Sequence, residues 1–451
     1  MTDDAYEAVV IGMGPGGEVA ATRLLQAGKR VAVVERELIG GECGYWACIP
    51  SKTLLRPVEL ALQAAAAPGV TTPPLDWEAA RQWRDAMVRH LDDAKQVAGY
   101  EDQGATVVRG EARIVGPGVV EVDGRRLVTQ HVIVATGSRP VVPEIEGLDE
   151  CTVWTNREAT GFEEVPGRVV VIGASAVAVE VAQYLAGYGA QVTLVGRGPR
   201  LLRREEPRVG ELAAEHLRAR GIDLRLGAGP VRAFKDGADS SLVLDDGSVL
   251  TADVLVLATG RRPRTEGLGL EELEVTLDGH GALAVDEHCH AGAGVWGVGD
   301  VTGTAMFTHV AKYQARIATA AILGRPRTAR YDSVPRVVFG HPEIAAVGMI
   351  EEQAVAGGRR VRTSQVDLTA ALARPWTYEE EPTGAWLGLV ADADTDLLVG
   401  AWAVAPQASE WIHQAALAIG AAIPIDRLLD HVPQFPTYSE GFVPALEGLL
   451  D

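Results

Sequence analysis

The sequence predicts an α/β protein in which a strand, a glycine-rich turn, a helix and a second strand occur twice. The first copy starts with the apolar run 7–11, passes through a glycine turn into a helix over 18–27, and ends with the apolar strand 31–34. The second copy starts with the apolar run 168–172 and repeats this order. Two such units in one chain indicate two Rossmann-like domains.

The first turn has the spacing of a dinucleotide-binding loop. Gly12 permits the tight turn, Gly14 lets the backbone approach a pyrophosphate, and Gly17 lets the helix pack on the strand. The start of the helix offers amide donors and a positive dipole to the phosphates. The next strand ends at Glu35, an acid placed to bind a ribose diol.

The second turn departs from this spacing. It starts at Gly173, but Ser175 replaces the second glycine and Ala178 the third. Alanine is acceptable at the third position, whereas Ser175 is expected to crowd the approach of a pyrophosphate.

The strand after the second turn ends without an acid, at Gly196 and Arg197. Arg197 and Arg203 can hold a ribose 2′-phosphate through bidentate hydrogen bonds, so we expect NADPH rather than NADH. The alternative is a solvated basic loop.

Other strand–turn segments fit a chain that binds two nucleotides. The runs 132–135 and 254–258 each lead into a Thr-Gly pair, at Thr136-Gly137 and at Thr259-Gly260. The strand 295–298 ends in a tight turn before Asp300, where we expect the carboxylate to meet a sugar-alcohol hydroxyl.

Two cysteines follow the first unit closely. Cys43 and Cys48 are five residues apart, and an ideal helix separates such Cα atoms by roughly 8.5 Å, beyond the usual disulfide range of about 4.4–6.8 Å. A bridge therefore needs a distorted turn, which we expect Gly44 to supply. A strained disulfide of this kind is typical of redox catalysis. The alternative is two unrelated thiols near a loop.

Composition excludes several classes of protein. The 451 residues carry a net charge of −20, which argues against nucleic acid or an anionic membrane as a partner. No apolar run reaches the roughly 18–20 residues of a membrane span, and four cysteines do not make a secreted disulfide framework. The acidic N-terminus does not look like a secretory signal. We expect a cytoplasmic protein without a metal site.

Taken together, these motifs resemble the class I flavin-dependent pyridine nucleotide-disulfide oxidoreductases, the group of lipoamide dehydrogenase, glutathione reductase and mercuric reductase. The resemblance implies an FAD-binding domain over 1–150 and 265–330, an NAD(P)H-binding domain over 151–264, and a C-terminal α+β dimerisation domain over 331–451. It also implies a homodimer with active sites shared between the subunits.

The resemblance assigns cofactor contacts and roles. It implies FAD contacts at Gly12, Gly14, Gly17, Glu35, Lys52, Thr136, Gly137 and Asp300. It implies NADPH contacts at Gly173, Ser175, Ala178, Arg197, Arg203 and Gly260.

By the same resemblance, Cys48 faces the flavin as a thiolate and Cys43 meets the substrate. Lys52 lies beside the flavin and pairs with Glu180. The alternative for Lys52 is an ordinary solvated lysine on a helix.

The C-terminal signature departs from the family. The family carries a catalytic histidine before Pro-Thr and a glutamate five residues after it, and here the two positions are Phe435 and Glu440. Phenylalanine can neither protonate a leaving thiol nor stabilise a thiolate. His431 and Tyr438 lie nearby but do not match the motif position. We therefore expect poor turnover of lipoamide or glutathione disulfide.

The sequence thus predicts an NADPH-dependent flavoenzyme that reduces its own Cys43–Cys48 disulfide and passes electrons to a small thiol, disulfide or other small-molecule acceptor. Two alternatives remain open. One is a reductase/carboxylase that cleaves carbon–sulfur bonds, which Phe435 suggests. The other is a redox-sensing flavoprotein with little turnover, which the degenerate turn at Ser175 suggests.

Overall fold

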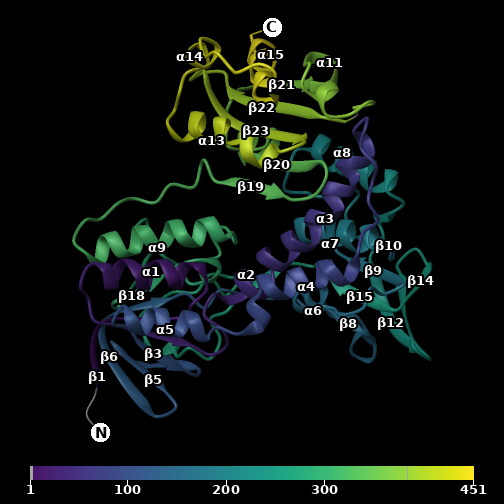
Figure 1. The fold of residues 1–451 in the computed structure, drawn as a ribbon. Coiled ribbons are helices and arrows are strands. Elements are labelled where there is room, and N and C mark those ends of the chain that lie inside the picture. The colour runs from purple at the N-terminus through teal and green to yellow at the C-terminus, as the bar shows by residue number, and fades with distance from the viewer. Residues whose placement is uncertain (1–3, 383, 451) are drawn as a thin grey trace. The chain divides into compact units, whose positions relative to one another are not determined.

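The computed structural model describes residues 4–382 and 384–450 and consists of two compact units (Figure 1). One unit contains the chain up to Pro50, Gln82–Val141 and Gly260–Arg330. The other contains Ser51–Arg81, Val142–Thr259 and the chain from Tyr331 onward. The expected boundary between the second and third domains lies inside the second unit, so the division into three domains stays a prediction.

The first unit is built on a sheet whose central strands are parallel. Its order is β3-β2-β1-β6-β18, and β17 pairs with the outer edge of β18 in the antiparallel direction. Ile11 at the end of β1 lies beside Val34 and Val134. The strand order reverses at β1, which is where this class of fold binds ligands. The strands are β1 (Asp4–Ile11), β2 (Val31–Glu35), β3 (Thr106–Arg109), β6 (Arg125–Val134), β17 (His290–Gly292) and β18 (Val295–Gly297).

Two helices, α1 (Pro15–Gln26) and α9 (Thr308–Ile322), lie side by side against this sheet (Figure 1). α1 starts with a proline whose fixed φ suits a first helical turn, and its buried face carries mostly glycine and alanine. Small residues at this spacing let the helix approach the strands closely. The short helix α2 (Gly41–Tyr45) follows β2, and α3 (Cys48–Ala66) starts three residues after α2 ends.

The second unit repeats the parallel arrangement. Its sheet has the order β11-β10-β9-β15-β8, and Ile172 at the end of β9 lies beside Val195 and Leu257. The helix α7 (Ala176–Gly187) follows β9 and is buried along most of its length. The strands are β8 (Val153–Trp154), β9 (Arg168–Ile172), β10 (Gln191–Gly196), β11 (Asp223–Leu226) and β15 (Val254–Leu257). The two predicted Rossmann-like folds are therefore present.

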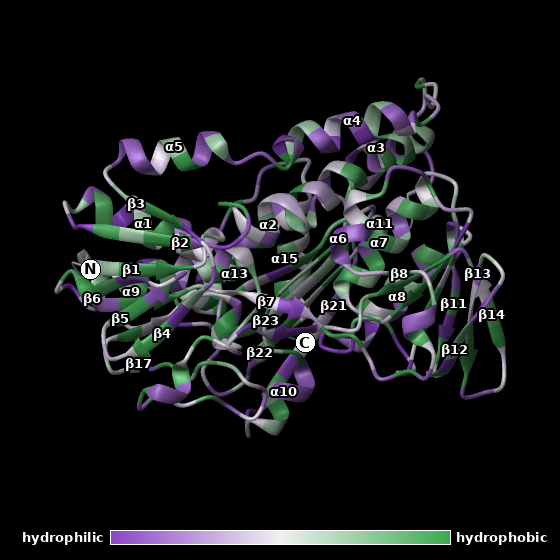
Figure 2. Cartoon of the chain, turned by 90° about the horizontal axis from the view of Figure 1, so that it is seen from below, coloured by the Kyte–Doolittle hydropathy of each residue, from purple (hydrophilic) through white to green (hydrophobic). Residues whose placement is uncertain are grey.

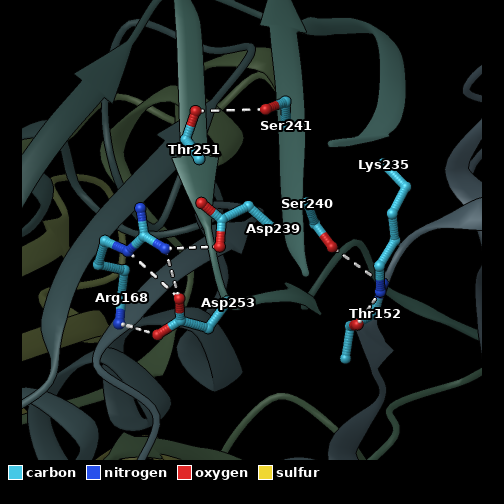
Figure 3. Close-up of polar contacts among 8 residues, drawn as sticks. All are labelled: Thr152, Arg168, Lys235, Asp239, Ser240, Ser241, Thr251 and Asp253. Carbon is cyan, nitrogen blue, oxygen red and sulfur yellow. Dashed lines mark hydrogen bonds and ion pairs between the residues drawn. The ribbon is translucent and has the colours of Figure 1, made fainter. Parts of the chain in front are cut away.

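A polar network ties a three-stranded antiparallel sheet, β12 (Pro230–Asp236), β13 (Asp239–Leu244) and β14 (Val249–Ala252), to the parallel one (Figure 3). Arg168 donates to Asp253 at 2.7 Å and to Asp239 at 2.8 Å, and the Thr152 amide donates to Ser240 at 2.9 Å. Arg168 is the first residue of β9, whereas the glycine turn follows its last residue. The network therefore braces the end of the sheet away from the turn.

The C-terminal part of the second unit is an antiparallel sheet of order β19-β20-β23-β22-β21 with a core of its own. The helices α13 (His413–Gly420), α14 (Ile425–Leu429) and α15 (Phe442–Glu447) follow its last strand. The strands are β19 (Pro335–Val338), β20 (Glu343–Gly348), β21 (Val361–Asp367), β22 (Trp386–Asp392) and β23 (Leu397–Ala405). Apolar residues, green in Figure 2, follow the strands of the sheets. Within the described residues no helix is long and apolar enough to span a bilayer.

Candidate active site

The first glycine turn leaves room where a pyrophosphate would approach. Gly12 has φ +92°, and a Cβ there would lie 2.6 Å from the Ala135 carbonyl oxygen. A Cβ on Gly17 would lie 2.0 Å from the Gly12 oxygen, so any side chain would force the helix off the strand. A Cβ on Gly14, which caps α1, would have no atom within 4 Å. The three glycines thus have the geometry that a dinucleotide requires.

Glu35 closes the same turn from β2. Its carboxylate accepts hydrogen bonds from the Met13 amide at 2.8 Å and from the Glu37 amide at 2.8 Å, and only 8% of the residue is exposed. These bonds fix the acid beside the start of α1, where each oxygen keeps a lone pair for a ribose hydroxyl.

Asp300 lies in a partly buried hydrogen-bond network of the first unit. Ser138 Oγ donates to Asp300 Oδ2 at 2.6 Å, and Arg261 Nε donates to Ser138 Oγ at 2.7 Å. Burial raises the pKa of Asp300, and the Ser138 bond and the Arg261 charge oppose that shift. The Thr136 hydroxyl donates to the Arg264 carbonyl at 2.6 Å, and Gly137 turns the chain with φ +72°.

Ser138 and Arg261 were not among the site residues that the sequence predicted. They lie in β7 (Ser138–Pro140) and β16 (Arg261–Pro263), which pair in the antiparallel direction. Each of these two strands follows a Thr-Gly pair, at 136–137 and 259–260. This repeat was the feature of the sequence that could have indicated that the two segments are related.

The cysteine pair converges on one hydroxyl. Cys43 lies in α2 and Cys48 starts α3, and both thiols are half-buried. The Thr308 hydroxyl, at the start of α9, donates to Cys43 Sγ at 3.1 Å and lies 3.5 Å from Cys48 Sγ. Thr308 is a site residue that the local sequence motifs did not reveal.

The break between the cysteines is not where we expected it. Gly44 lies inside α2, and the helix ends at Trp46, which has φ −134°. The expectation that Gly44 supplies the distorted turn is therefore wrong. The two residues between α2 and α3 interrupt the helix instead. The distance between the two cysteines is therefore not set by the spacing of a continuous helix.

The surroundings of Cys43 change the pKa of its thiol. The pKa of Cys43 is raised, first because its thiol is hydrogen-bonded to Cys48, then because of burial and the negative charge on Cys48. Thr308 and Lys312 act in the opposite direction. The Cys48 sulfur and burial thus both favour the protonated form of Cys43.

Lys52 and Glu180 form an ion pair in the second unit. Lys52 Nζ lies 2.7 Å from Glu180 Oε2, and the Glu180 side chain is 9% exposed. The other oxygen of Glu180 accepts from the Phe339 amide at 3.0 Å, and Lys52 Nζ lies 4.8 Å from the centre of the Phe339 ring. The pairing expected from the sequence is present, and the roles of the two residues stay predictions.

The second glycine turn is as tight as the first. Gly173 has φ +136°, and a Cβ there would lie 2.3 Å from the Ala258 oxygen. Ser175 caps α7, because its hydroxyl accepts from the Ala178 amide at 3.4 Å and donates to the Ala258 carbonyl at 2.9 Å. The hydroxyl is thus engaged with the turn itself.

The other residues expected at the NADPH site lie in both units. Arg197 and Arg203 are exposed, and the Arg203 side chain lies over Gly198, where a Cβ would be 2.7 Å from Arg203 Cδ. Gly260 falls in the first unit and has φ +119°.

The C-terminal signature lies in the second unit. Phe435 is 75% exposed, and Glu440 accepts from the Thr437 amide at 2.9 Å, which caps the short helix η6 (Tyr438–Gly441). Tyr438 is buried, which raises the pKa of its phenol, and His431 is exposed.

Comparison with known proteins identifies the family. The model of the pyridine nucleotide-disulphide oxidoreductases matches residues 6–315, and that of their dimerisation domain matches residues 334–446. A dihydrolipoyl dehydrogenase of Thermus scotoductus is 36% identical, with 98% of this chain and 97% of that protein covered. A mercuric reductase of Staphylococcus aureus is 32% identical, with 97% and 81% covered.

Solved structures agree in fold. The Cu(II) complex of the HOCl-induced flavoprotein disulfide reductase RclA from Escherichia coli is 27% identical and has a TM-score of 0.88, with 99% of each chain covered. LpdA from Mycobacterium tuberculosis is 26% identical and has a TM-score of 0.87, with 98% of this chain and 99% of that one covered. The predicted fold class is confirmed, and the chain belongs to the pyridine nucleotide-disulphide oxidoreductases, which use FAD and NAD(P)H.

Proposed function

We propose that this enzyme uses NADPH to reduce a Cys43–Cys48 disulfide and passes the electrons to a disulfide or another small acceptor. The observation that carries the proposal is the convergence of both thiols on the Thr308 hydroxyl, at 3.1 and 3.5 Å, in the unit that also holds the first glycine turn. FAD, when bound, supplies the two-electron transfer between the nicotinamide and the disulfide.

The two cysteines have different roles in this proposal. Cys48 carries the negative charge of the reduced pair and faces the flavin. Cys43 keeps the proton and meets the acceptor, because a proton held between the thiols can move to Cys48 as Cys43 attacks. Thr308 holds both sulfur atoms in place.

FAD contacts are proposed at the first turn and at the ends of the neighbouring strands. Gly14 offers open space above the start of α1, and Glu35 and Asp300 offer acceptors for hydroxyl groups. The full proposed set is Gly12, Gly14, Gly17, Glu35, Lys52, Thr136, Gly137 and Asp300.

NADPH contacts are proposed at the second turn. The strand β10 ends at Gly196 and exposes the Arg197 guanidinium directly after it, with Arg203 close by in sequence and also exposed. A 2′-phosphate is the nucleotide group that two guanidinium groups bind best. The full proposed set is Gly173, Ser175, Ala178, Arg197, Arg203 and Gly260.

A homodimer is proposed because the region matched to the dimerisation domain exposes large apolar side chains. Trp376 is 61% exposed, Leu417 69% and Val432 86%. The match of residues 334–446 to the family's dimerisation domain supports the same conclusion. The shared active sites expected from the sequence place Phe435 and Glu440 at the partner's cysteine pair in this proposal.

The two alternatives that the sequence left open gain no support. The relatives are reductases and a dehydrogenase, and none of those reported above is a carboxylase. Ser175, which suggested a weakened nicotinamide site, uses its hydroxyl to cap α7.

Anaerobic titration of the purified holoenzyme tests the proposal. Two-electron reduction by NADPH should bleach the flavin and produce a long-wavelength charge-transfer band from the Cys48 thiolate. Cys48→Ser should abolish the band, while Cys43→Ser should show the band without any reductant. Retention of the band in the Cys48 variant would reverse the two roles, and a flavin that NADPH does not reduce would refute the proposed activity.

A further inference from the structure

The Lys52–Glu180 ion pair is in contact with the turn between β19 and β20. Glu180 accepts from the Phe339 amide at 3.0 Å through Oε1 and from Lys52 Nζ at 2.7 Å through Oε2. Lys52 Nζ also lies over the Phe339 ring, 4.8 Å from its centre, and a cation in this position is attracted by the ring. Phe339 thus contacts both charged groups, one through its backbone and the other through its side chain.

A buried amide on α7 holds this turn. Gln183 lies three residues after Glu180, on the same side of the helix, and is 6% exposed. Its Nε2 donates to the Phe339 carbonyl at 3.3 Å, and its Oε1 accepts from the His341 amide at 3.2 Å. Gln183 therefore binds the turn on both sides of Gly340. All of these residues lie in the second unit.

Gly340 shows how closely the amide and the turn approach each other. Its φ is +141°, and a Cβ there would lie 2.3 Å from Gln183 Nε2 and 2.4 Å from Gln183 Oε1. Any side chain at this position would displace the amide, besides straining the backbone. The turn can therefore pack against α7 in this way only with glycine at position 340.

The Gln183 amide uses its full hydrogen-bonding capacity. Nε2 also donates to the Val179 carbonyl at 3.3 Å, and Oε1 also accepts from Arg220 Nη1 at 2.7 Å. A carboxamide has two donor hydrogens and two lone pairs, and all four are engaged here. The amide is held in one orientation, because turning it over would place its oxygen against two carbonyl groups and its NH2 group against two donors.

Arg220 holds the amide from the other side. It directly follows α8 (Pro207–Ala219), and burial lowers the pKa of its guanidinium to about 10. Burial of a cation costs free energy, so Arg220 is not an ordinary solvated arginine at the end of a helix. Burial also lowers the pKa of His341 to about 4, so its imidazole is uncharged at neutral pH.

We propose that Gln183 and Arg220 are positioning residues for Lys52. Arg220 orients the Gln183 amide, the amide holds the turn, and the turn presents the Phe339 amide and ring to the ion pair. The inference rests on the proposed function, because the position of Lys52 affects electron transfer only if Lys52 lies beside the flavin.

A fixed position is important for a lysine in this role. Two-electron reduction adds negative charge to a flavin, and a cation within about 4–6 Å favours the more negative form. The lysine side chain is a flexible four-carbon stem, so a single ion pair does not determine where its ammonium group lies. Contacts with both Glu180 and the Phe339 ring restrict the ammonium group to one place.

NMR of the reductively methylated holoenzyme tests the positioning itself. The chain has five lysines, so the ¹³C-dimethyl signal of Lys52 can be identified by its loss in Lys52→Arg. The Phe339 ring should shift this signal upfield in the wild type. Gln183→Met keeps the length of the side chain and removes the amide, and it should abolish most of the upfield shift, as Phe339→Leu should.

Arg220→Met is a milder second variant, because it removes only one of the four hydrogen bonds of the amide. It should move the Lys52 signal in the same direction by a smaller amount. Arg218→Met, which changes an exposed arginine on α8, is the matched control and should leave the signal in its wild-type position.

The midpoint potential of the bound flavin tests the link to function. Lys52→Met should lower the equilibrium constant for two-electron reduction by about tenfold or more, which is a fall of about 30 mV. Gln183→Met should lower the potential in the same direction. A purely structural role for Gln183 would lower Tm and leave the potential of the folded holoenzyme unchanged.

The outcomes separate the positioning role from the proposed function. If the Lys52 signal keeps its wild-type position in Gln183→Met and Arg220→Met, the positioning role is wrong while the proposed function stands. If the signal moves but Lys52→Met leaves the flavin potential unchanged, Lys52 does not lie beside the flavin. That result would overturn the proposed FAD contact of Lys52 and, with it, the role of the two positioning residues in electron transfer.

Discussion

In each parallel sheet, the strand before the glycine turn is followed by a glycine whose Cβ would collide with the carbonyl oxygen of the residue after a neighbouring strand. Gly12 would meet Ala135 at 2.6 Å, and Gly173 would meet Ala258 at 2.3 Å. The amides of the two glycines also make the same bond, to Val34 and to Val195, each at 2.8 Å. The two turns thus have the same backbone geometry. A difference in which nucleotide each turn binds must therefore come from the side chains around it.

The acid that closes the first turn has no counterpart in the second. Because Val34 corresponds to Val195, Glu35 corresponds to Gly196. A Cβ on Gly196 would lie 3.0 Å from Ala174 Cβ and 3.2 Å from Leu226, so the site has little room for a carboxylate. The following residue, Arg197, brings a cation instead. The two proposed nucleotide sites therefore differ in the charge at the end of the strand after the turn, and the glycine turns themselves are alike.

The middle position of each turn differs as well. Gly14 opens onto empty space, whereas the Ser175 hydroxyl bonds to Ala178 and Ala258 within its own turn. In the first turn, a ligand can therefore approach the backbone at Gly14 directly. In the second turn, the Ser175 side chain caps the helix at the equivalent position.

Gly14→Val should have the largest effect on this comparison. Branched carbons would fill the space that a pyrophosphate needs, and forcing atoms into an occupied site costs about 1–3 kcal/mol, besides the lost phosphate contacts. We expect FAD affinity to fall by roughly 100-fold or more, measured as flavin content after purification and as Kd by fluorescence titration. Full retention of FAD would place the pyrophosphate elsewhere.

Arg197→Ala should have the next largest effect, confined to the second site. A charge-assisted contact to a 2′-phosphate contributes about 1.5–3 kcal/mol, so NADPH should bind about 10- to 100-fold more weakly while NADH binding stays nearly unchanged. Arg218→Ala, an exposed arginine on α8 (Pro207–Ala219), is the control. Equal losses for both cofactors would mean that Arg197 has a structural role.

Asp300 should make the stability of the folded protein depend on pH. Burial raises its pKa in the folded protein, so the folded state takes up a proton more readily than the unfolded state. Its contribution to stability is therefore present at low pH and is lost as the pH rises through the raised pKa. Asp300→Asn should flatten this part of the profile of Tm against pH for the FAD-free protein. An unchanged profile would show that Asp300 does not titrate in this range.

Ser175→Gly should have the smallest effect. Replacing a serine cap by glycine costs only a few tenths of a kcal/mol, and the hydroxyl already bonds within its own turn. We expect Tm and the Kd for NADPH to change little. A gain in NADPH affinity of about tenfold or more would show that Ser175 crowds the pyrophosphate after all.

Local features of this protein follow from its amino-acid sequence alone. Tight turns require glycine at Gly12 and Gly173, and the alternation of apolar strands and helices predicts the two parallel sheets, because these features depend on backbone geometry within a few residues. The ion pair of Lys52 with Glu180 was also anticipated, through the family resemblance rather than through any local pattern.

Contacts between side chains that are far apart in the sequence become visible only in the folded protein. Thr308 reaches Cys43 from 265 residues away, and Ser138 reaches Asp300 from 162 residues away. The break between α2 and α3 falls at Trp46 rather than at Gly44. Burial and long-range contacts depend on the whole chain, so no local pattern encodes them.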